Sequence, residues 1–153
     1  MKIAVGSDEA TPLTEAVVRD LESRGMSVEL FGALAEGDDP EWPEVGQKVA
    51  EMVARGDADQ GILFCWTGTG VSIAANKIPG VRAALCTDAA TASGARQWNH
   101  ANVLVMGLRL TSREIARELL DAWFSTPPGE SEDATMVARL AAIDESYRSV
   151  VSR

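Results

Sequence analysis

Residues 61–77, GILFCWTGTGVSIAANK, place a thiol and two hydroxyls where an apolar run meets the start of a helix. The run ends at Cys65, and hydroxyl residues then alternate with glycines after Trp66: Thr67, Gly68, Thr69 and Gly70. Glycines let backbone approach a ligand closely, and backbone N–H groups at a helix start favour anions. A cysteine in such surroundings gains thiolate character. The pattern predicts a base or nucleophile beside a loop that stabilises an oxyanion.

A purely structural interpretation of the same loop stays open. Cys65 would then be a small buried hydrophobe that ends a strand, and the glycines would only make the turn. Thr67 would cap the following helix. No cofactor is predicted, because the loop lacks the third glycine of the dinucleotide fingerprint and the chain has no Gly-Lys-Ser/Thr of a nucleotide loop. With one histidine in the sequence, a multi-histidine metal site is not expected.

Short apolar strands alternate with amphipathic helices along the chain. The strands are predicted at 2–6, 26–32, 61–65, 81–86 and 102–107, and the helices at 12–24, 43–55, 70–77, 88–98, 111–124 and 131–150. A capping-box spacing between Thr111 and Glu114 marks the start of the fifth helix. This alternation predicts an α/β fold with a five-stranded parallel sheet, helices on both faces and a C-terminal helix, within one domain over 1–153.

Ligands of open parallel sheets bind outside the carboxyl ends of the strands. That rule selects the loops GSDEAT after the first strand, CWTGTG after the third and CTD after the fourth.

The balance of 14 basic against 23 acidic residues gives a net charge of −9. It argues against nucleic acid and anionic membranes as partners, because both require basic surface, whereas a small anionic substrate needs only local positive charge. No apolar run reaches the roughly 18 residues of a membrane span, and the start MKIAVGSD shows no signal-peptide pattern. Cys65 and Cys86 are therefore expected to be free thiols in a reducing cytoplasm.

The stretch CWTGTGVSIAANKIPGVRAAL resembles the core motif of the ribose-5-phosphate isomerase B and galactose-6-phosphate isomerase family. The stretch GSDEA is similar to the family's Gly-x-Asp-His-Ala, and RQWNHANVLVMGLRL to its Arg-Glu-His-Asn-Asp-Ala-Asn segment and fifth strand. The likeness extends over residues 1–126. It implies a three-layer Rossmann-like fold, a homodimer with active sites at the subunit interface, and aldose–ketose isomerisation through an enediolate. It also implies that neither a metal nor an organic cofactor takes part.

Carried over by position, the resemblance gives Cys65 the role of the catalytic base. Thr67 and the 68–70 backbone match the groups that stabilise the enediolate oxygens, and Asp8 matches a carboxylate that binds substrate hydroxyls. The full set of predicted substrate-binding residues is Glu9, Trp66, Gly68, Thr69, Gly70, Trp98, Asn99, His100 and Arg109. Asn99 matches an asparagine near the substrate carbonyl, and Arg109 matches a family arginine.

Two histidines of the family pattern are missing here. The histidine after Asp8 is Glu9, and the ring-opening histidine is Trp98. His100 stands where the family has aspartate. It either takes the place of the ring-opening histidine from two residues away or is an ordinary surface or loop-capping residue. Trp66 and Trp98 are expected to narrow one pocket, unless they pack against each other or fill the dimer interface.

The phosphate end of the pattern is also altered. The family's Arg-His-x-x-Arg clamp corresponds here to SEDATMVARL, with Glu132, Asp133 and Met136 at its basic positions. Carboxylates there would repel a phosphate dianion. Arg109 remains available to bind phosphate, and Arg139 either helps or is an ordinary exposed arginine of the helix. The predicted function is therefore an aldose–ketose isomerase for a short, acyclic or differently substituted sugar or sugar phosphate. The alternatives are a non-catalytic sugar- or anion-binding relative and another enolising enzyme such as an epimerase.

Overall fold

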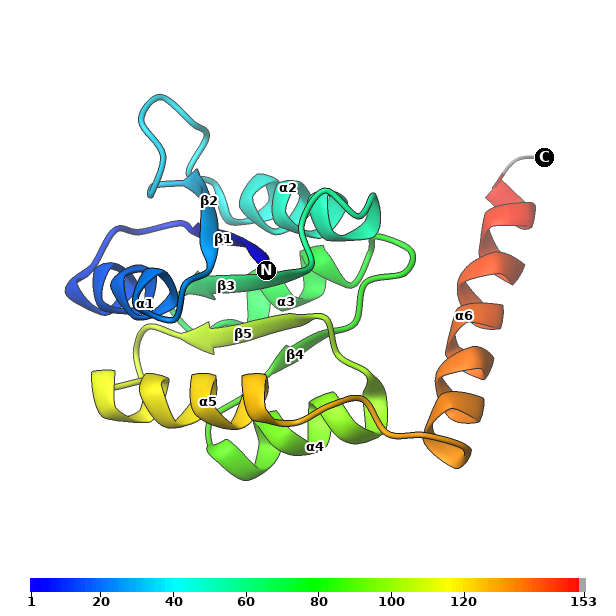
Figure 1. Ribbon diagram of the computed structural model, residues 1–153. Coiled ribbons are helices and arrows are strands. Elements are labelled where there is room, and N and C mark those ends of the chain that lie inside the picture. Colours follow the sequence, from blue (N-terminus) through cyan, green and yellow to red (C-terminus); the bar gives the residue numbers. More distant parts are fainter. Residues whose placement is uncertain (152–153) are drawn as a thin grey trace.

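Five parallel strands form one sheet in the order β2-β1-β3-β5-β4 in a computed structural model that describes residues 1–151 (Figure 1). The strands are β1 Lys2–Ser7, β2 Ser27–Gly32, β3 Gln60–Cys65, β4 Ala83–Leu85 and β5 Val103–Gly107. Every neighbouring pair is parallel, which confirms the predicted fold class. The strand β4 is shorter than predicted because the Val81 and Arg82 N–H groups bind the Ile78 carbonyl and the Asn102 side chain before the strand begins.

The helices are α1 Pro12–Ser23, α2 Trp42–Ala54, α3 Thr69–Ala75, α4 Ala89–Asn99, α5 Arg113–Ser125 and α6 Glu132–Val151. The side chains of β3 alternate between the two faces of the sheet. Ile62 and Phe64 belong to the core beneath α1, α4 and α5, whereas Leu63 and Cys65 belong to the core beneath α2 and α3. Because successive strand residues point to opposite faces, this alternation places the Cys65 side chain on the α2 and α3 side.

The capping box predicted between Thr111 and Glu114 is wrong. The N–H of Thr111 donates to the Gly107 carbonyl at 3.2 Å in the turn that leaves β5. The cap is therefore one residue later, at Ser112, whose Oγ accepts from the Ile115 N–H at 3.2 Å, and α5 begins at Arg113, two residues after the predicted start. The predicted start of α4 is confirmed, since the Asp88 carboxylate accepts from the Thr91 N–H at 2.7 Å.

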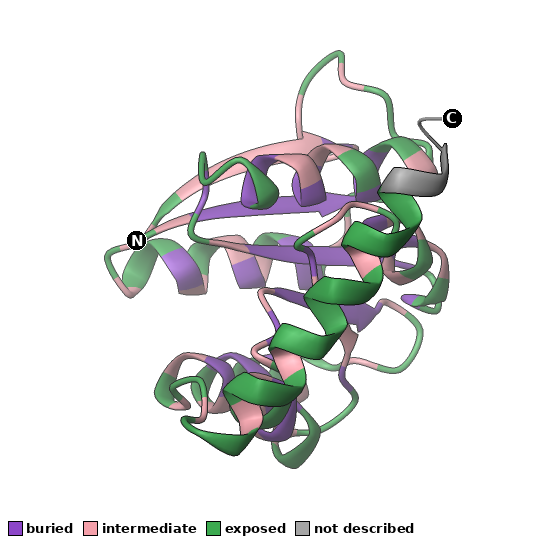
Figure 2. Cartoon of the chain, turned by 90° about the vertical axis from the view of Figure 1, so that its right-hand side faces the viewer, coloured by how far each residue is buried: buried purple, intermediate pink, exposed green. Residues whose placement is uncertain are grey.

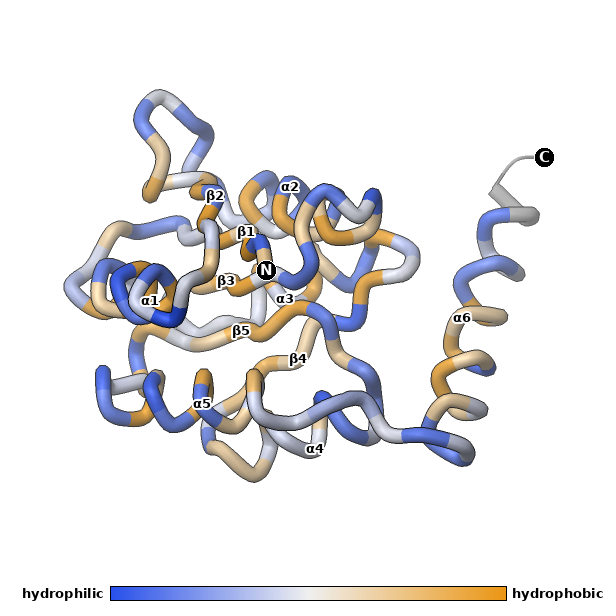
Figure 3. Tube along the Cα trace, in the orientation of Figure 1, coloured by the Kyte–Doolittle hydropathy of each residue, from blue (hydrophilic) through white to orange (hydrophobic). Residues whose placement is uncertain are grey.

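The C-terminal helix α6 leaves the three layers and crosses the edge of the sheet where the strands begin (Figures 1 and 2). The Gly129 N–H donates to the Gln97 carbonyl at 2.9 Å, and Asp144 accepts from the Gly80 N–H at 3.1 Å. Four large apolar side chains repeat along α6 at helical spacing and are 45–70% exposed, namely Met136, Leu140, Ile143 and Tyr147. In Figure 3 the lower and middle turns of α6 are coloured as hydrophobic, between hydrophilic turns at its two ends.

Within the described part of the chain, none of the helices combines the length and the hydrophobicity that crossing a membrane requires.

Candidate active site

Two predicted site elements, the loops after β1 and β3, meet the end of β5 in one row at the carboxyl edge of the sheet. Cys65 is paired in register with Gly107 at the end of β5. On the other side, Ser7 of β1 is paired with Phe64, so Asp8 follows directly beside Cys65. Since adjacent strands lie about 4.8 Å apart, Asp8, Cys65 and Gly107 form a continuous row across the strand ends.

The two cysteines are free thiols, as predicted, but they differ in surroundings. Cys65 is 5% exposed and ends the central strand of the sheet. Cys86 is fully buried, and burial raises its pKa to about 12, with the nearby Asp88 charge adding to the shift. A thiol with such a pKa stays protonated at neutral pH, so Cys86 is no candidate for a base.

The backbone of the glycine loop is fixed by β5. The Cys65 carbonyl accepts from the Leu108 N–H at 3.0 Å, and the Trp66 carbonyl accepts from the Arg109 N–H at 2.9 Å. Gly107 leaves no gap beneath the loop, because a Cβ on it would lie 2.7 Å from the Thr67 carbonyl oxygen. The loop is thus held against the end of β5 by hydrogen bonds and by contact.

Thr67 does not cap α3. The cap position is Gly68, at a φ of +79° that favours glycine, and no side chain caps the helix there. The Thr67 hydroxyl instead lies 2.7 Å from the hydroxyl of Thr69, and both residues are exposed. Of the two interpretations left open by the sequence, the geometry therefore favours a Thr67 hydroxyl that faces outward from the loop.

Asp8 is an electrostatically unusual carboxylate. Its pKa is raised chiefly by burial, with a backbone hydrogen bond opposing the shift and the charges of Glu9 and Glu41 adding to it. Its Oδ1 atom is buried and accepts no hydrogen bond from the residues in the range 1–151. A buried acceptor without a partner costs free energy, so Asp8 holds its carboxylate at a cost to the stability of the fold.

Asp8→Asn is expected to stabilise the fold while it impairs activity. A raised native pKa means that the folded state binds the proton more tightly, so ionisation of Asp8 lowers the free energy of unfolding as pH rises above its ordinary value of 3.8. The variant should therefore melt at a higher temperature than the unmodified protein at pH 7, with the difference shrinking toward pH 4. Thermal melts over this range test the sign, and Asp57→Asn, at an exposed carboxylate, is the control. A lower melting temperature for Asp8→Asn at pH 7 would contradict the expectation.

Two residues at this edge were missed by the sequence interpretation. Trp42 begins α2, and its ring packs on Gly70, where a Cβ would lie 3.0 Å from Trp42 Cδ2. Glu41, directly before it, contributes to the raised pKa of Asp8. The signal that could have found them is the strand-end rule applied to β2, because the loop after β2 leads to the start of α2 at the same edge.

Trp98, Asn99 and His100 lie at the opposite edge of the sheet from Cys65. The His100 carbonyl accepts from Arg82 Nε at 2.9 Å, and the Asn102 side chain accepts from the Arg82 N–H, where β4 and β5 begin. Trp66 and Trp98 of one chain therefore share no pocket, and the prediction that they narrow one pocket requires a second copy of the chain. The reason is topological, since α4 runs back antiparallel to the strands and ends at their amino edge (Figure 1).

His100 and Trp98 have distinct local contacts at that edge. His100 ends α4 at a φ of +48°, and its Nε2 lies 2.7 Å from the Gly129 carbonyl oxygen. Trp98 is 59% exposed and packs back on Gly94, where a Cβ would lie 2.7 Å from its ring. Asn99 lines a hollow of about 450 Å³ between α6 and the strand starts. His100 thus anchors the segment before α6, whereas Trp98 and Asn99 are presented outward.

Arg109 follows β5 and is the predicted cation at the carboxyl edge, where it is exposed. The carboxylates Glu132 and Asp133 open α6, next to the end of α4.

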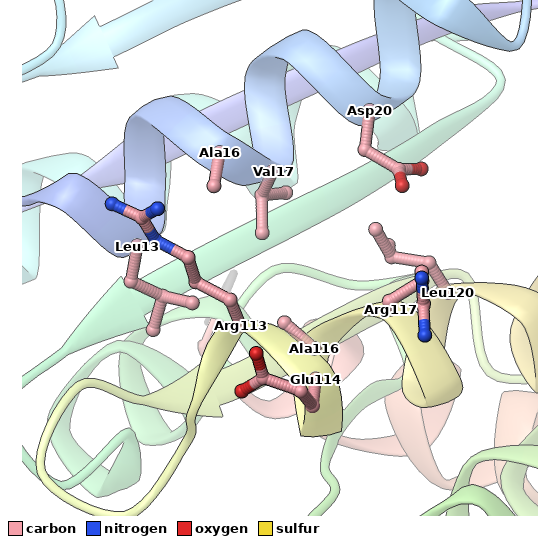
Figure 4. A pocket seen from close by; sticks show the side chains of 9 residues that line it. All are labelled: Leu13, Ala16, Val17, Asp20, Arg113, Glu114, Ala116, Arg117 and Leu120. Atoms are coloured by element: carbon pink, nitrogen blue, oxygen red, sulfur yellow. The ribbon is translucent and has the colours of Figure 1, made fainter.

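A separate groove of about 240 Å³ lies between α1 and α5, with Arg113, Arg117 and Asp20 among its lining residues (Figure 4). None of the predicted site residues lines this groove. No group of three or more His, Cys, Asp or Glu side chains in the described range is arranged to hold a metal ion.

A parallel α/β sheet with a buried thiol, an outward hydroxyl and an unpaired carboxylate oxygen at one edge has the parts of a proton-transfer enzyme. Residues 3–140 match the model of the Ribose/Galactose Isomerase family. D-erythrulose-4-phosphate isomerase of Pectobacterium atrosepticum is 36% identical over 124 residues, 80% of this chain and 82% of that protein. D-erythrulose-4-phosphate isomerase 2 of Mycolicibacterium smegmatis is 42% identical over 126 residues, 80% of this chain and 83% of that protein.

The fold is also similar to that of a solved structure. Ribose-5-phosphate isomerase B of Clostridium thermocellum superimposes with a TM-score of 0.89 and 38% identity, covering 96% of this chain and 99% of that one. The chain belongs to the Ribose/Galactose Isomerase family. The predictions of family, of a Rossmann-like fold and of an aldose–ketose isomerase are confirmed.

Proposed function

We propose that this chain, acting as one domain over 1–153, interconverts a four-carbon 2-ketose 4-phosphate and its aldose through the site around Cys65. The observation that carries the proposal is the row of Asp8, Cys65 and Gly107 at the carboxyl edge, with the Thr67 hydroxyl presented beside it. A base next to hydroxyl and backbone donors is what removal of a proton beside a carbonyl requires.

In the proposed reaction, the Cys65 thiolate removes the proton from C2 of the aldose. The C–H electrons form the C1=C2 double bond, and the C1 carbonyl oxygen becomes an enediolate oxygen. Thr67 and the N–H groups of the 68–70 loop donate hydrogen bonds to the enediolate. Cys65 then returns the proton to C1 while the proton on O2 moves to O1, which leaves the carbonyl at C2.

The strand order suggests how a phosphorylated substrate lies in the site. Because β3 lies between β1 and β5, the carboxylates near Asp8 and the cation Arg109 stand on opposite sides of Cys65. Asp8, Glu9 and Glu41 would repel a phosphate dianion, whereas the guanidinium of Arg109 attracts it. We therefore place the phosphate toward β5 and the hydroxyl-bearing end toward Asp8.

The size of the substrate is inferred from Trp98 and from the two relatives named for D-erythrulose 4-phosphate. An aldotetrose closes a five-membered ring only through O4, and in a 4-phosphate that oxygen is esterified. Such a substrate stays open-chain, so it needs no group that opens a ring. The replacement of the ring-opening histidine of the family pattern by Trp98 is consistent with this chemistry.

D-erythrose 4-phosphate should be turned over with a kcat/KM at least about tenfold above that of D-ribose 5-phosphate. The measurement is initial rates on both compounds and on D-galactose 6-phosphate. Trp98→His is the matched variant. It should gain activity toward ribose 5-phosphate and so reduce the difference between the kcat/KM values for the two substrates. A preference of the unmodified protein for ribose 5-phosphate would overturn the substrate assignment.

We further propose a homodimer in which a second copy brings Trp98 and Asn99 to the Cys65 loop. Two surfaces support it, since α6 exposes the apolar side chains of Met136, Leu140, Ile143 and Tyr147, and Asn99 lines an open hollow. Large exposed apolar side chains in a continuous stretch favour association with a partner. In a two-fold dimer the two sites would be equivalent, each built from both chains.

Mixing two inactive variants should restore activity if the site is shared. Cys65→Ala and Asn99→Ala are each expected to be impaired, but their heterodimer has one site with both residues intact. Random reassortment of co-expressed subunits should recover about a quarter of the unmodified activity. A mixture no more active than its components would place the whole site within one chain. The cytoplasmic location stays a prediction from the sequence.

A further inference from the structure

The hydroxyls of Thr67 and Thr69 form a pair at 2.7 Å in the loop after β3. We propose that Thr69 is a positioning residue, which orients the Thr67 hydroxyl toward the enediolate oxygens. This inference rests on the function proposed above, in which Thr67 is a donor to the reacting atoms.

Because the backbone around Thr67 is held in place, the direction of its hydroxyl depends on the side-chain rotamer. The carbonyls of the two preceding residues, Cys65 and Trp66, are bound by N–H groups that follow β5, and the Thr67 carbonyl packs against Gly107. Threonine is β-branched, so its hydroxyl samples a few discrete χ1 positions. A hydrogen bond from a fixed neighbour can select one of them.

Thr69 is such a fixed neighbour. It is the first residue of α3, and the Ser72 N–H donates to the Gly68 carbonyl at 3.2 Å in the same turn. The next residue, Gly70, is covered by the ring of Trp42. The Thr69 hydroxyl is therefore presented from a backbone held on both sides.

The direction of the hydrogen bond follows from proton counting. Each hydroxyl has one proton to donate and two lone pairs. For Thr67 to donate to an enediolate oxygen, its own proton must be free, so Thr69 must donate to Thr67 Oγ1. A hydroxyl that accepts one hydrogen bond becomes a stronger donor in the next, so Thr69 also strengthens the bond from Thr67 to the substrate.

The experiment is a double-mutant cycle of Thr67→Val, Thr69→Val and the double variant, assayed with D-erythrose 4-phosphate and D-ribose 5-phosphate. Valine keeps the branched shape and removes the hydroxyl. Thr69→Val should lower kcat about tenfold with KM changed less than about twofold, because the interaction matters most in the transition state. Thr69→Ser, which keeps the hydroxyl, should recover most of the rate, and Thr69→Ala repeats the test without a branched side chain.

In the Thr67→Val background, Thr69→Val should have no further effect, since Thr69 acts through Thr67. Additive losses would overturn the inference and make Thr69 a direct substrate contact. An unchanged kcat in Thr69→Val would overturn it as well. The Thr67→Val variant tests the proposed function separately from the role of Thr69. If its activity is undiminished, Thr67 is not the donor that the proposed function requires.

Discussion

Cys65→Ala should lower kcat by about a thousandfold while the protein stays folded. The thiol is the general base of the proposed reaction, and of the three residues in the row, Asp8, Cys65 and Gly107, only Asp8 carries another titratable group. Alanine is smaller than cysteine, so the substitution removes the base without overpacking the core. Initial rates with D-erythrose 4-phosphate measure the loss.

Cys86→Ala is the matched control for the thiol. Its sulfur is fully buried, with a pKa raised to about 12 by burial, and it belongs to the core beneath α1, α4 and α5. Its removal should cost stability of about 1 kcal/mol and leave kcat unchanged. Loss of activity in both variants to the same extent would point to unfolding rather than to chemistry.

Solvent exchange separates an isomerase from a binding protein at the same site. Enolisation in D₂O should wash deuterium into the substrate at the carbon next to the carbonyl, and Cys65→Ala should abolish this exchange. Exchange that persists in Cys65→Ala would overturn the assignment of the base. Tight binding of a sugar phosphate without any exchange would favour the non-catalytic alternative.

The fold could be predicted because its signals are local. The apolar run at 61–65 and the alternation of short strands with amphipathic helices depend on neighbours a few residues away. The Thr111 error has the same origin. Thr111 and Ser112 are adjacent hydroxyl residues, and the sequence pattern fits either of them as the cap of α5. Ser112 is the cap because the Thr111 N–H is bound to the Gly107 carbonyl in a turn.

The site was only half predictable because its other contacts are not local. Trp42 covers Gly70 from another helix, and no sequence spacing encodes that contact. The position of Trp98, by contrast, follows from topology alone. A helix that returns from the carboxyl edge must end at the amino edge, so residues near 98 cannot reach Cys65 of the same chain.

Gly107→Ala should reduce kcat/KM by about a hundredfold, although Gly107 is no part of the reacting groups. The added Cβ would lie 2.7 Å from the Thr67 carbonyl oxygen and 2.9 Å from its carbonyl carbon. Real Cβ atoms do not approach backbone so closely, and backbone cannot rotate away as a side-chain end can. The loop must shift away from β5, which moves the Thr67 hydroxyl relative to Cys65.

Gly25→Ala tells this local effect apart from a general loss of stability. Gly25 has a φ of +79°, so alanine is strained there, but nothing lies within 4 Å of the added Cβ. Both variants should lose roughly 1–2 kcal/mol of unfolding free energy, as strain at Gly25 and as overpacking at Gly107. Only Gly107→Ala should lose activity, because only the added Cβ at Gly107 contacts the loop that carries Thr67. Full activity in Gly107→Ala would mean that the loop absorbs the displacement, and the rigid placement of Thr67 would have to be abandoned.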